Sequence, residues 1–182
     1  MIDRLWYSSR LHSCEFFRAG PDEAGGRRLR GDVVVLLGDR PAHVQYQVDV
    51  DTDWCTRRVD VDIEQATTRT CLRIAGDGQG AWRVDDVPAP DLAGCLDIDL
   101  GCTPSTNTLP IRRLGLPVGE QRDISVAWLR FPELTLHAAT QSYRRLDDHT
   151  WRYQSGRFSA TLLVDDDGYV RRYGHNLWRT PT

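Results

Sequence analysis

Hydrophobic and polar residues alternate along much of this chain, and helical periodicity is almost absent. Apolar side chains occupy every second position in the segments 44–50 and 59–63, with polar or charged residues between them. A period of two places alternate side chains on opposite faces of an extended chain, so both segments are predicted to be half-buried strands. Further strands are predicted at 33–37, 71–75, 81–84, 124–131, 134–143, 151–154, 158–164 and 169–173.

Stretches rich in glycine, proline and aspartate separate the predicted strands, as at 76–80 and 165–168. Such stretches favour tight turns, and Gly168 is expected to adopt a positive φ. Many short strands joined by turns indicate an all-β protein, in which an antiparallel meander curls into a roll, barrel or sandwich. We expect a single domain over residues 1–182, with one short helix at 109–114 and a mobile loop at 19–30.

The alternation also fixes the register of one hairpin. If residues 51–56 form its loop, Val48 faces Val59 on the apolar side, and Asp49 faces Arg58 on the polar side. The same register places Arg57 on the apolar face, opposite Val50. An arginine there either extends its charged end to the solvent or lines a polar cavity, and both interpretations stay open.

Composition and charge exclude some classes of function. The chain has 182 residues and a formal net charge of −3, and all of its basic residues are arginine. The negative charge and the lack of a basic stripe interleaved with aromatic residues argue against a nucleic-acid-binding module. The N-terminus lacks the apolar core of a signal peptide, and no apolar run approaches the ~20 residues of a membrane-spanning helix. We expect a cytoplasmic protein.

The cysteine pattern argues against a disulfide framework and against a zinc site. The five cysteines are odd in number and include no CxxC pair, and the histidines show no HxH or HExxH spacing; the cysteines are Cys14, Cys55, Cys71, Cys95 and Cys102. We therefore expect free thiols, with no metal and no other cofactor.

The segment 94–114 is the most unusual part of the chain. Asp97 and Asp99 lie on one face if this part is extended, and the sequence Thr-Pro-Ser-Thr-Asn-Thr follows at 103–108. Hydroxyl, amide and carboxylate groups at this density suit a polyhydroxylated ligand such as a sugar. The segment has no histidine, no lysine and no nucleophile–base pair, so it indicates binding before catalysis. Alternatively, these groups cap the following helix, with Asn107 as its N-cap.

Two other motifs are weaker. The Gly-rich segment 76–80 lacks the helix and lysine of a phosphate-binding loop and is better explained as a hairpin turn. Aromatic residues cluster late in the chain, and most are expected in the core. Gln141, Tyr143, Trp151 and Tyr153 are candidates to line a groove for an amphiphile, because tyrosine and tryptophan combine an apolar body with a polar end.

The segment 96–114 resembles the signature of a bacterial family called putative glycolipid-binding proteins. Further matching pieces are Trp6 with Glu15, the run 54–57, the run 141–143, and the run 164–170 before Tyr173. Together they cover nearly the whole chain in order, and the segment 19–30 is the main departure. The resemblance implies a spiral β-roll, similar to the sheet of periplasmic lipoprotein carriers, and a glycolipid-related role. It implies no catalytic residues.

Two functional hypotheses follow. In the first, the protein binds an amphiphile such as a glycolipid without acting on it: the apolar interior of the roll takes the acyl part, and polar residues meet the head group. The residues proposed for this role are Arg57, Asp97, Asp99, Thr106, Asn107, Gln141 and Tyr143. In the second, the protein is a hydrolase-type enzyme for a sugar or lipid-linked substrate, with Asp97 and Asp99 as acid and base. That mechanism requires a carboxylate with a raised pKa in a cavity.

Overall fold

A computed structural model describes residues 1–175 and 177–181. All of its strands belong to one fifteen-stranded sheet. The strands are β1 (Ile2–Ser8), β2 (Ser13–Pro21), β3 (Arg27–Leu37), β4 (Arg40–Val50), β5 (Thr56–Gln65), β6 (Thr68–Gly76), β7 (Trp82–Val84), β8 (Val87–Pro88), β9 (Asp97–Leu100), β10 (Gln121–Leu129), β11 (Leu136–Arg145), β12 (Thr150–Ser155), β13 (Phe158–Val164), β14 (Val170–Tyr173) and β15 (Trp178–Arg179). The α-helix α1 spans Thr108–Leu114, and two short 3₁₀ helices, η1 (Pro90–Leu92) and η2 (Ser105–Asn107), precede it.

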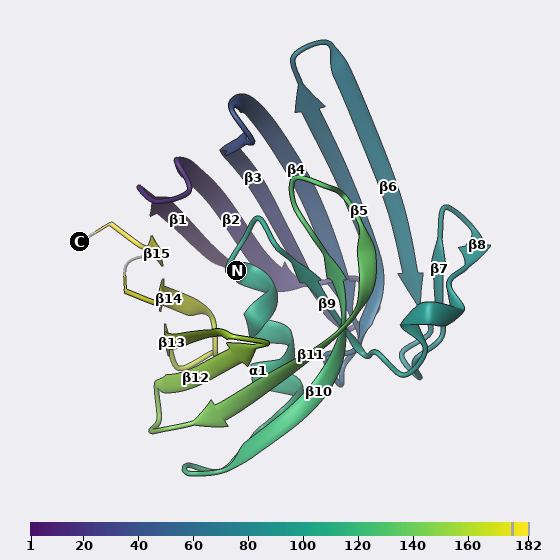
Figure 1. Cartoon of the computed structure of the whole chain (residues 1–182). Helices are drawn as coiled ribbons and strands as arrows, with labels where there is room; N and C mark the ends of the chain where they lie inside the picture. Colours follow the sequence, from purple (N-terminus) through teal and green to yellow (C-terminus); the bar gives the residue numbers. More distant parts are fainter. Residues whose placement is uncertain (176, 182) are drawn as a thin grey trace.

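The sheet consists of two halves that meet at its middle. Strands β1 to β8 run in sequence order from the middle to one edge, and the chain then crosses to the other edge as β9. It returns through β10 to β15, where β15 pairs with β1. The pair β9–β10 is parallel and the other pairs are antiparallel. The sheet curls without closing, since β8 and β9 remain its edges (Figure 1). The predicted all-β roll is confirmed.

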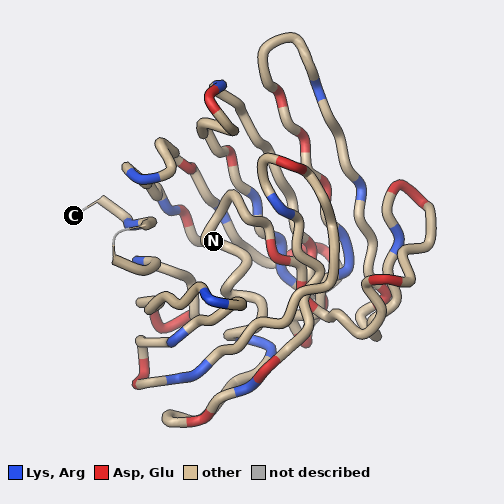
Figure 2. The backbone as a smooth tube through the Cα atoms, in the orientation of Figure 1, with Lys and Arg blue, Asp and Glu red and all other residues tan. Residues whose placement is uncertain are grey.

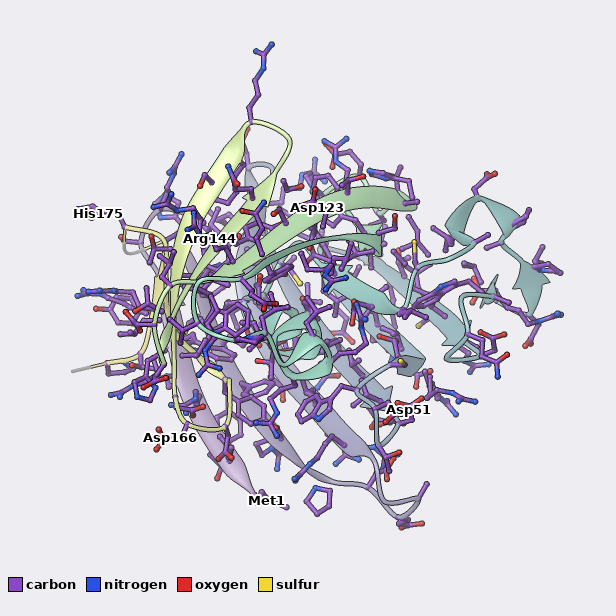
Figure 3. The ribbon with its side chains drawn as sticks, turned by 90° about the horizontal axis from the view of Figure 1, so that it is seen from below. Met1, Asp51, Asp123, Arg144, Asp166 and His175 are labelled. Carbon is purple, nitrogen blue, oxygen red and sulfur yellow. The ribbon has the colours of Figure 1, made fainter. Side chains whose placement is uncertain are left out.

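The chain itself fills the inside of the roll. Every residue from Cys102 to Ile111 is buried, and α1 lies within the curve of the sheet (Figures 1 and 3). Leu109 and Ile111 of α1 join a core made by the inward-facing side chains of both halves, including Trp6, Phe17 and Leu162. The interior expected to receive an acyl chain is therefore occupied by this helix and by the polar segment before it.

The hairpin β4–β5 has the predicted register over most of its length. Val48 pairs with Val59, and Asp49 pairs with Arg58. A register shift between Asp49 and Val50 then places Thr56 opposite Val50. The prediction that Arg57 faces the apolar side is wrong, because the register shift places Thr56, and not Arg57, opposite Val50. The Arg57 guanidinium is half exposed and lies 3.6 Å from the Asp51 carboxylate.

The segment 19–30 is mostly strand, and the prediction of a loop over its whole length is wrong. Strand β2 continues to Pro21 and β3 begins at Arg27, so only residues 22–26 form a turn. The Asp22 carboxylate accepts hydrogen bonds from the backbone N–H groups of Ala24 and Gly26, which fixes this turn. The alternation of apolar and polar residues is hard to recognise in this segment, because its many glycine and arginine residues do not indicate which face of the strand is buried.

The predicted short helix is confirmed as α1. It ends at Gly115, whose left-handed φ of 51° lets its N–H reach the carbonyl oxygen of Ile111. Gly168 has a φ of 81°, as its turn requires. No helix in the described part of the chain is long and apolar enough to cross a membrane.

Candidate binding cleft

The polar segment 103–108 is buried, so its hydroxyl and amide groups must find partners inside the protein. Four of its side chains find partners in both halves of the sheet, whereas the buried Thr108 hydroxyl has no hydrogen-bond partner in the described part of the chain. Thr103 and Ser105 bond to β2 and β4, whereas Thr106 and Asn107 bond to β9 and β11. The segment therefore connects the two halves of the roll through side-chain hydrogen bonds.

The first set of bonds surrounds Glu15, which is fully buried on β2. The Tyr46 hydroxyl donates to Glu15 Oε1 at 2.5 Å and lies 2.7 Å from Ser105 Oγ. The Thr103 hydroxyl donates to the same carboxyl oxygen at 2.9 Å. Burial raises the pKa of Glu15 to about 8, although these two hydroxyls act in the opposite direction. The carboxyl group is thus protonated at neutral pH.

The second set of bonds brings together five of the seven residues predicted to bind a ligand. Gln141 Nε2 donates to Asp99 Oδ2 at 2.5 Å, and Thr106 Oγ1 donates to Asp99 Oδ1 at 3.3 Å. The Tyr143 hydroxyl donates to Asn107 Oδ1 at 3.0 Å and lies 3.3 Å from Gln141 Oε1. Burial raises the pKa of Asp99, opposed by the bonds from Gln141 and Thr106. This network fixes the Asp99 carboxylate in one orientation.

Asn107 occupies the N-cap position of α1, as predicted, but it does not cap the helix with its side chain. Its backbone is already helical, because η2 runs directly into α1, and its side chain makes no capping bond. Asn107 Nδ2 instead donates to the carbonyl oxygen of Pro104 at 3.0 Å. The side chain therefore serves the network with Tyr143.

Asp97 and Arg57 do not join the network. The Arg113 guanidinium of α1 forms a forked pair with Asp97, at 2.6 Å from Nη2 and 3.0 Å from Nε. The Asp97 side chain is fully buried, and this burial raises its pKa against the effect of Arg113. Arg57 lies in the partly exposed ion pair with Asp51 described above. Asp97 and Asp99 share a strand but have separate partners.

A cleft of about 240 Å³ opens beside Asp99. Its walls come from strands of the β9–β15 half of the sheet, from the buried segment before α1, and from the turns that follow β1 and β14. The lining residues are Leu11, Asp99, Leu100, Gly101, Thr103, Pro104, Asn107, Trp128, Tyr153, Ser155, Phe158, Tyr173, Leu177 and Trp178. Of the residues predicted to bind a ligand or to line a groove, Asp99, Asn107 and Tyr153 reach the cleft. The remaining candidates do not line it: Arg57, Asp97, Thr106, Gln141, Tyr143 and Trp151.

Aromatic rings form much of the cleft wall. Phe158 and Tyr173 stack with ring centroids 6.2 Å apart, and Tyr153 lies 6.1 Å from Phe158 and 6.0 Å from Tyr173. On another part of the wall, the Arg130 guanidinium covers the Trp128 ring at 5.4 Å. Flat apolar walls with a fixed carboxylate and an amide suit a ligand that has an apolar face and hydroxyl groups.

A larger hollow, of about 500 Å³, lies on the outer face of β2 to β6. Acidic and basic positions are interspersed along these strands (Figure 2). Two of its carboxylates are already in ion pairs, Asp60 with Arg58 and Asp62 with Arg69. We therefore consider the cleft, with its apolar walls, the better candidate for a ligand. Across residues 1–175 and 177–181, no group of three or more His, Cys, Asp or Glu side chains is placed to hold a metal ion.

Sequence reasoning missed Glu15, Tyr46, Thr103 and Ser105 as one cluster, and Trp128, Phe158, Tyr173 and Trp178 as parts of the cleft wall. A signal for Glu15 exists: it occupies an inward-facing position of β2, between Ser13 and Phe17. A carboxyl group among the inward-facing, apolar positions of a strand predicts a buried polar cluster, because a buried carboxyl group needs hydrogen-bond partners. Of the aromatic wall, the late aromatic cluster indicated Tyr153 alone, because the contribution of the other rings depends on how the second half of the sheet curls.

Comparison with known proteins places the chain in a family. The family model described as "Putative glycolipid-binding" matches residues 3–179. A crystal structure of a DUF1089 family protein from Pseudomonas aeruginosa is similar, with 32% sequence identity, 93% of each chain covered and a TM-score of 0.84. No curated protein matches the sequence. A match over nearly the whole chain shows that this protein belongs to the family described as putative glycolipid-binding.

Proposed function

We propose that the cleft binds the hydroxylated head group of an amphiphile such as a glycolipid. The observation that carries the proposal is the Asp99 carboxylate, which two side chains hold in place at the wall of an aromatic cleft. A carboxylate accepts hydrogen bonds from sugar hydroxyls, and bonds to a charged group are stronger than neutral ones. The rings offer a flat surface to the apolar face of a sugar. The description of the family supports the same class of ligand.

The size of the cleft supports a head group and not a whole lipid. Its volume of about 240 Å³ is below the range of about 300–1,000 Å³ typical of sites that enclose drug-sized molecules. The acyl part would then lie at the mouth of the cleft, against Leu11, Phe158 and Leu177. This replaces the expectation of an acyl chain inside the roll, because α1 and the segment before it fill that space.

The geometry does not favour the alternative of an enzyme that uses Asp97 and Asp99 as acid and base. Arg113 engages both oxygens of Asp97, and Asp97 does not line the cleft. A two-carboxylate mechanism needs both groups beside the bond to be cleaved. Asp99 alone meets that condition, so binding is the function that these contacts support best.

Native mass spectrometry with a matched pair of lipids tests this proposal. The purified protein is incubated with glucosyl diacylglycerol and, separately, with diacylglycerol of the same acyl chains. We expect a one-to-one complex with the glucosylated lipid and little or none with the other, because the sugar supplies the contacts to Asp99 and Asn107. Equal retention of the two lipids would show that the head group is not recognised. Retention of neither would remove the lipid-binding function.

A further inference from the structure

The cleft beside Asp99 contains an acid but no base. Asp99 is its only carboxyl group, and no Arg, Lys or His in the described part of the chain lines it. Arg130 lies over the Trp128 ring, but it pairs with Glu133 and does not line the cleft. By contrast, four other hollows of the described surface are each lined by at least two arginines. The cleft therefore differs from these hollows, because a carboxylate is the only charged group in its wall.

Asp99 also lacks a cation of its own. Asp97, on the same strand, forms a forked pair with Arg113, whereas Asp99 takes part in no ion pair among the described residues. Burial raises the pKa of Asp99, and the bonds from Gln141 and Thr106 lower it. Both of these donors are neutral. Buried carboxylates are normally paired, because their desolvation is costly. A cationic group on a ligand would supply the missing partner.

Aromatic rings lie beside this carboxylate. The planes of Phe158 and Tyr173 are nearly parallel, at 14°, and Tyr153 is inclined to them by 62° and 52°. Burial is the main cause of the raised pKa of Tyr153 and of Tyr173, and the negative charge of Asp99 raises it further. Both hydroxyls therefore lie in the electrostatic field of the carboxylate. The face of an aromatic ring attracts cations, and groups of such rings are typical of sites that hold ammonium groups.

Other kinds of head group fit these walls less well. A phosphate or a uronic acid would lie beside Asp99 with no basic residue to pair with it, which is unfavourable in a partly buried site. An inorganic cation such as Ca²⁺ takes about six to eight oxygen ligands, and the wall has only one carboxylate. A neutral sugar can bond to Asp99 but leaves its charge unpaired. An ammonium group complements both the carboxylate and the rings.

We propose that the cleft selects a hydroxylated head group that carries an ammonium group, as in an amphiphile with an amino sugar. The ammonium group lies between the Asp99 carboxylate and the rings of Tyr153 and Tyr173. The remaining hydroxyls face the polar side chains of Asn107 and Ser155 in the same wall. The proposal rests on the proposed function, since it specifies the head group that the same cleft binds.

Isothermal titration calorimetry with matched octyl glycosides tests the selectivity. The probes are octyl glucosaminide, its N-acetylated form and octyl glucoside, each below its micelle concentration at about pH 6.5, where an amine of ordinary pKa is protonated. We expect octyl glucosaminide to bind about tenfold more tightly than octyl glucoside, because a neutral donor to the carboxylate becomes a charged one. The N-acetylated form should bind no more tightly than octyl glucoside, because it keeps the nitrogen but not the charge.

The variant Asp99→Asn shows whether the preference comes from the cleft carboxylate. The ratio of the two affinities should fall to about one, because neither probe then meets a charged acceptor. The matched control is Asp123→Asn, which removes the same charge from an exposed acid of β10 that does not line the cleft, and it should keep the tenfold preference. Loss of the preference in both variants, or its retention in Asp99→Asn, would overturn the proposal.

The inference and the proposed function can fail separately. Equal affinity of the unmodified protein for octyl glucoside and octyl glucosaminide would overturn the inference and leave the proposed function intact. Binding of neither probe would contradict both. Octyl phosphocholine also carries an ammonium group, but its phosphate finds no cation in the wall. It should bind more weakly than octyl glucosaminide, and equal binding would overturn the amino sugar as the source of the ammonium group.

Discussion

Two buried carboxyl groups show how a neighbouring residue decides the state of an acid. Glu15 has hydroxyl neighbours and no buried cation, so burial keeps it protonated. Asp97 has the Arg113 guanidinium and forms an ion pair. Asp99 has an amide and a hydroxyl as partners and lies at the cleft wall. The three acids thus differ in their partners and in their surroundings, although all of them lie inside the same roll.

Glu15 should make the stability of the protein fall as pH rises. Its pKa is about 8 in the folded protein, against an ordinary pKa of 4.5 for an exposed glutamate. Between these values the folded state holds a proton that the unfolded state has lost, so the free energy of unfolding falls by about 1.4 kcal/mol per pH unit from this group. Glu15→Gln keeps the neutral shape and should remove this contribution.

Urea unfolding of both proteins at pH 5 and pH 8 measures the effect. At pH 5 the two should have similar stability, and at pH 8 the Glu15→Gln variant should be more stable by several kcal/mol. Other titrating groups are common to both proteins and cancel in the comparison. Parallel pH profiles would show that Glu15 is ionised in the folded protein.

Loss of Arg113 should destabilise the protein strongly, because it leaves a buried carboxylate unpaired. We expect Arg113→Met to lower the free energy of unfolding at pH 7 by about 3–5 kcal/mol. The double variant Arg113→Met, Asp97→Leu removes both charges and should recover much of that loss, measured by urea unfolding. If the double variant is as unstable as the single one, packing and not charge is what Arg113 contributes.

At the scale of elements, local alternation predicted strands β3 to β7 and β10 to β14, at least in part, but it missed β1, β2, β8, β9 and β15. Long-range packing could not be predicted from it. The β4–β5 register followed from alternation alone, because a slip by one residue would turn every apolar side chain to the solvent. The bulge at Val50 could not be predicted from alternation, since a bulge leaves the composition of the strand unchanged. This bulge removes Arg57 from the apolar face, so one of the predicted site residues lies elsewhere.

The polar segment 103–108 also shows that long-range packing could not be predicted from local pattern. Its residues were identified from the sequence, and five of the seven predicted ligand-binding residues lie in one network. Burial was not predicted, because no local pattern indicates that a segment rich in threonine enters the interior of a curled sheet. The partners Glu15 and Tyr46 come from strands more than fifty residues away, with Tyr46 57 positions from Thr103.

Gly31 of β3 is required by the ring of Tyr46 on β4. A Cβ atom at Gly31 would lie 2.2 Å from Tyr46 Cε1, so Gly31→Ala must displace the ring that bonds to Glu15 and Ser105. We expect a loss of stability of about 1–3 kcal/mol by urea unfolding. Gly20→Ala on β2 is the control, because its nearest atoms lie at 3.8 Å. An equally large effect at Gly20 would mean that glycine in these strands matters for another reason.

At the scale of the whole molecule, the cleft is formed by segments that are far apart in the sequence: strands of the β9–β15 half of the sheet, the buried segment before α1 and the turn after β1. Asp99 and Trp128 come from β9 and β10 at one edge of the sheet, Tyr173 and Trp178 come from β14 and β15 near its middle, and Leu11 comes from the turn after β1. The buried segment joins the halves through Thr103 and Asn107, and both residues also line the cleft. The shape of the site therefore depends on the curl of the sheet and not on one motif.

The binding of octyl glucoside, measured by isothermal titration calorimetry below its micelle concentration, tests the central claim most directly. We predict one site per chain, with affinity about tenfold weaker in Asp99→Asn, because a bond to a charged acceptor becomes a bond to a neutral one. Asp123, labelled in Figure 3, is an exposed acid on β10 that does not line the cleft, and the Asp123→Asn variant should bind as the unmodified protein does. No binding, or equal binding by all three proteins, would contradict the claim that Asp99 and the cleft around it recognise a hydroxylated head group.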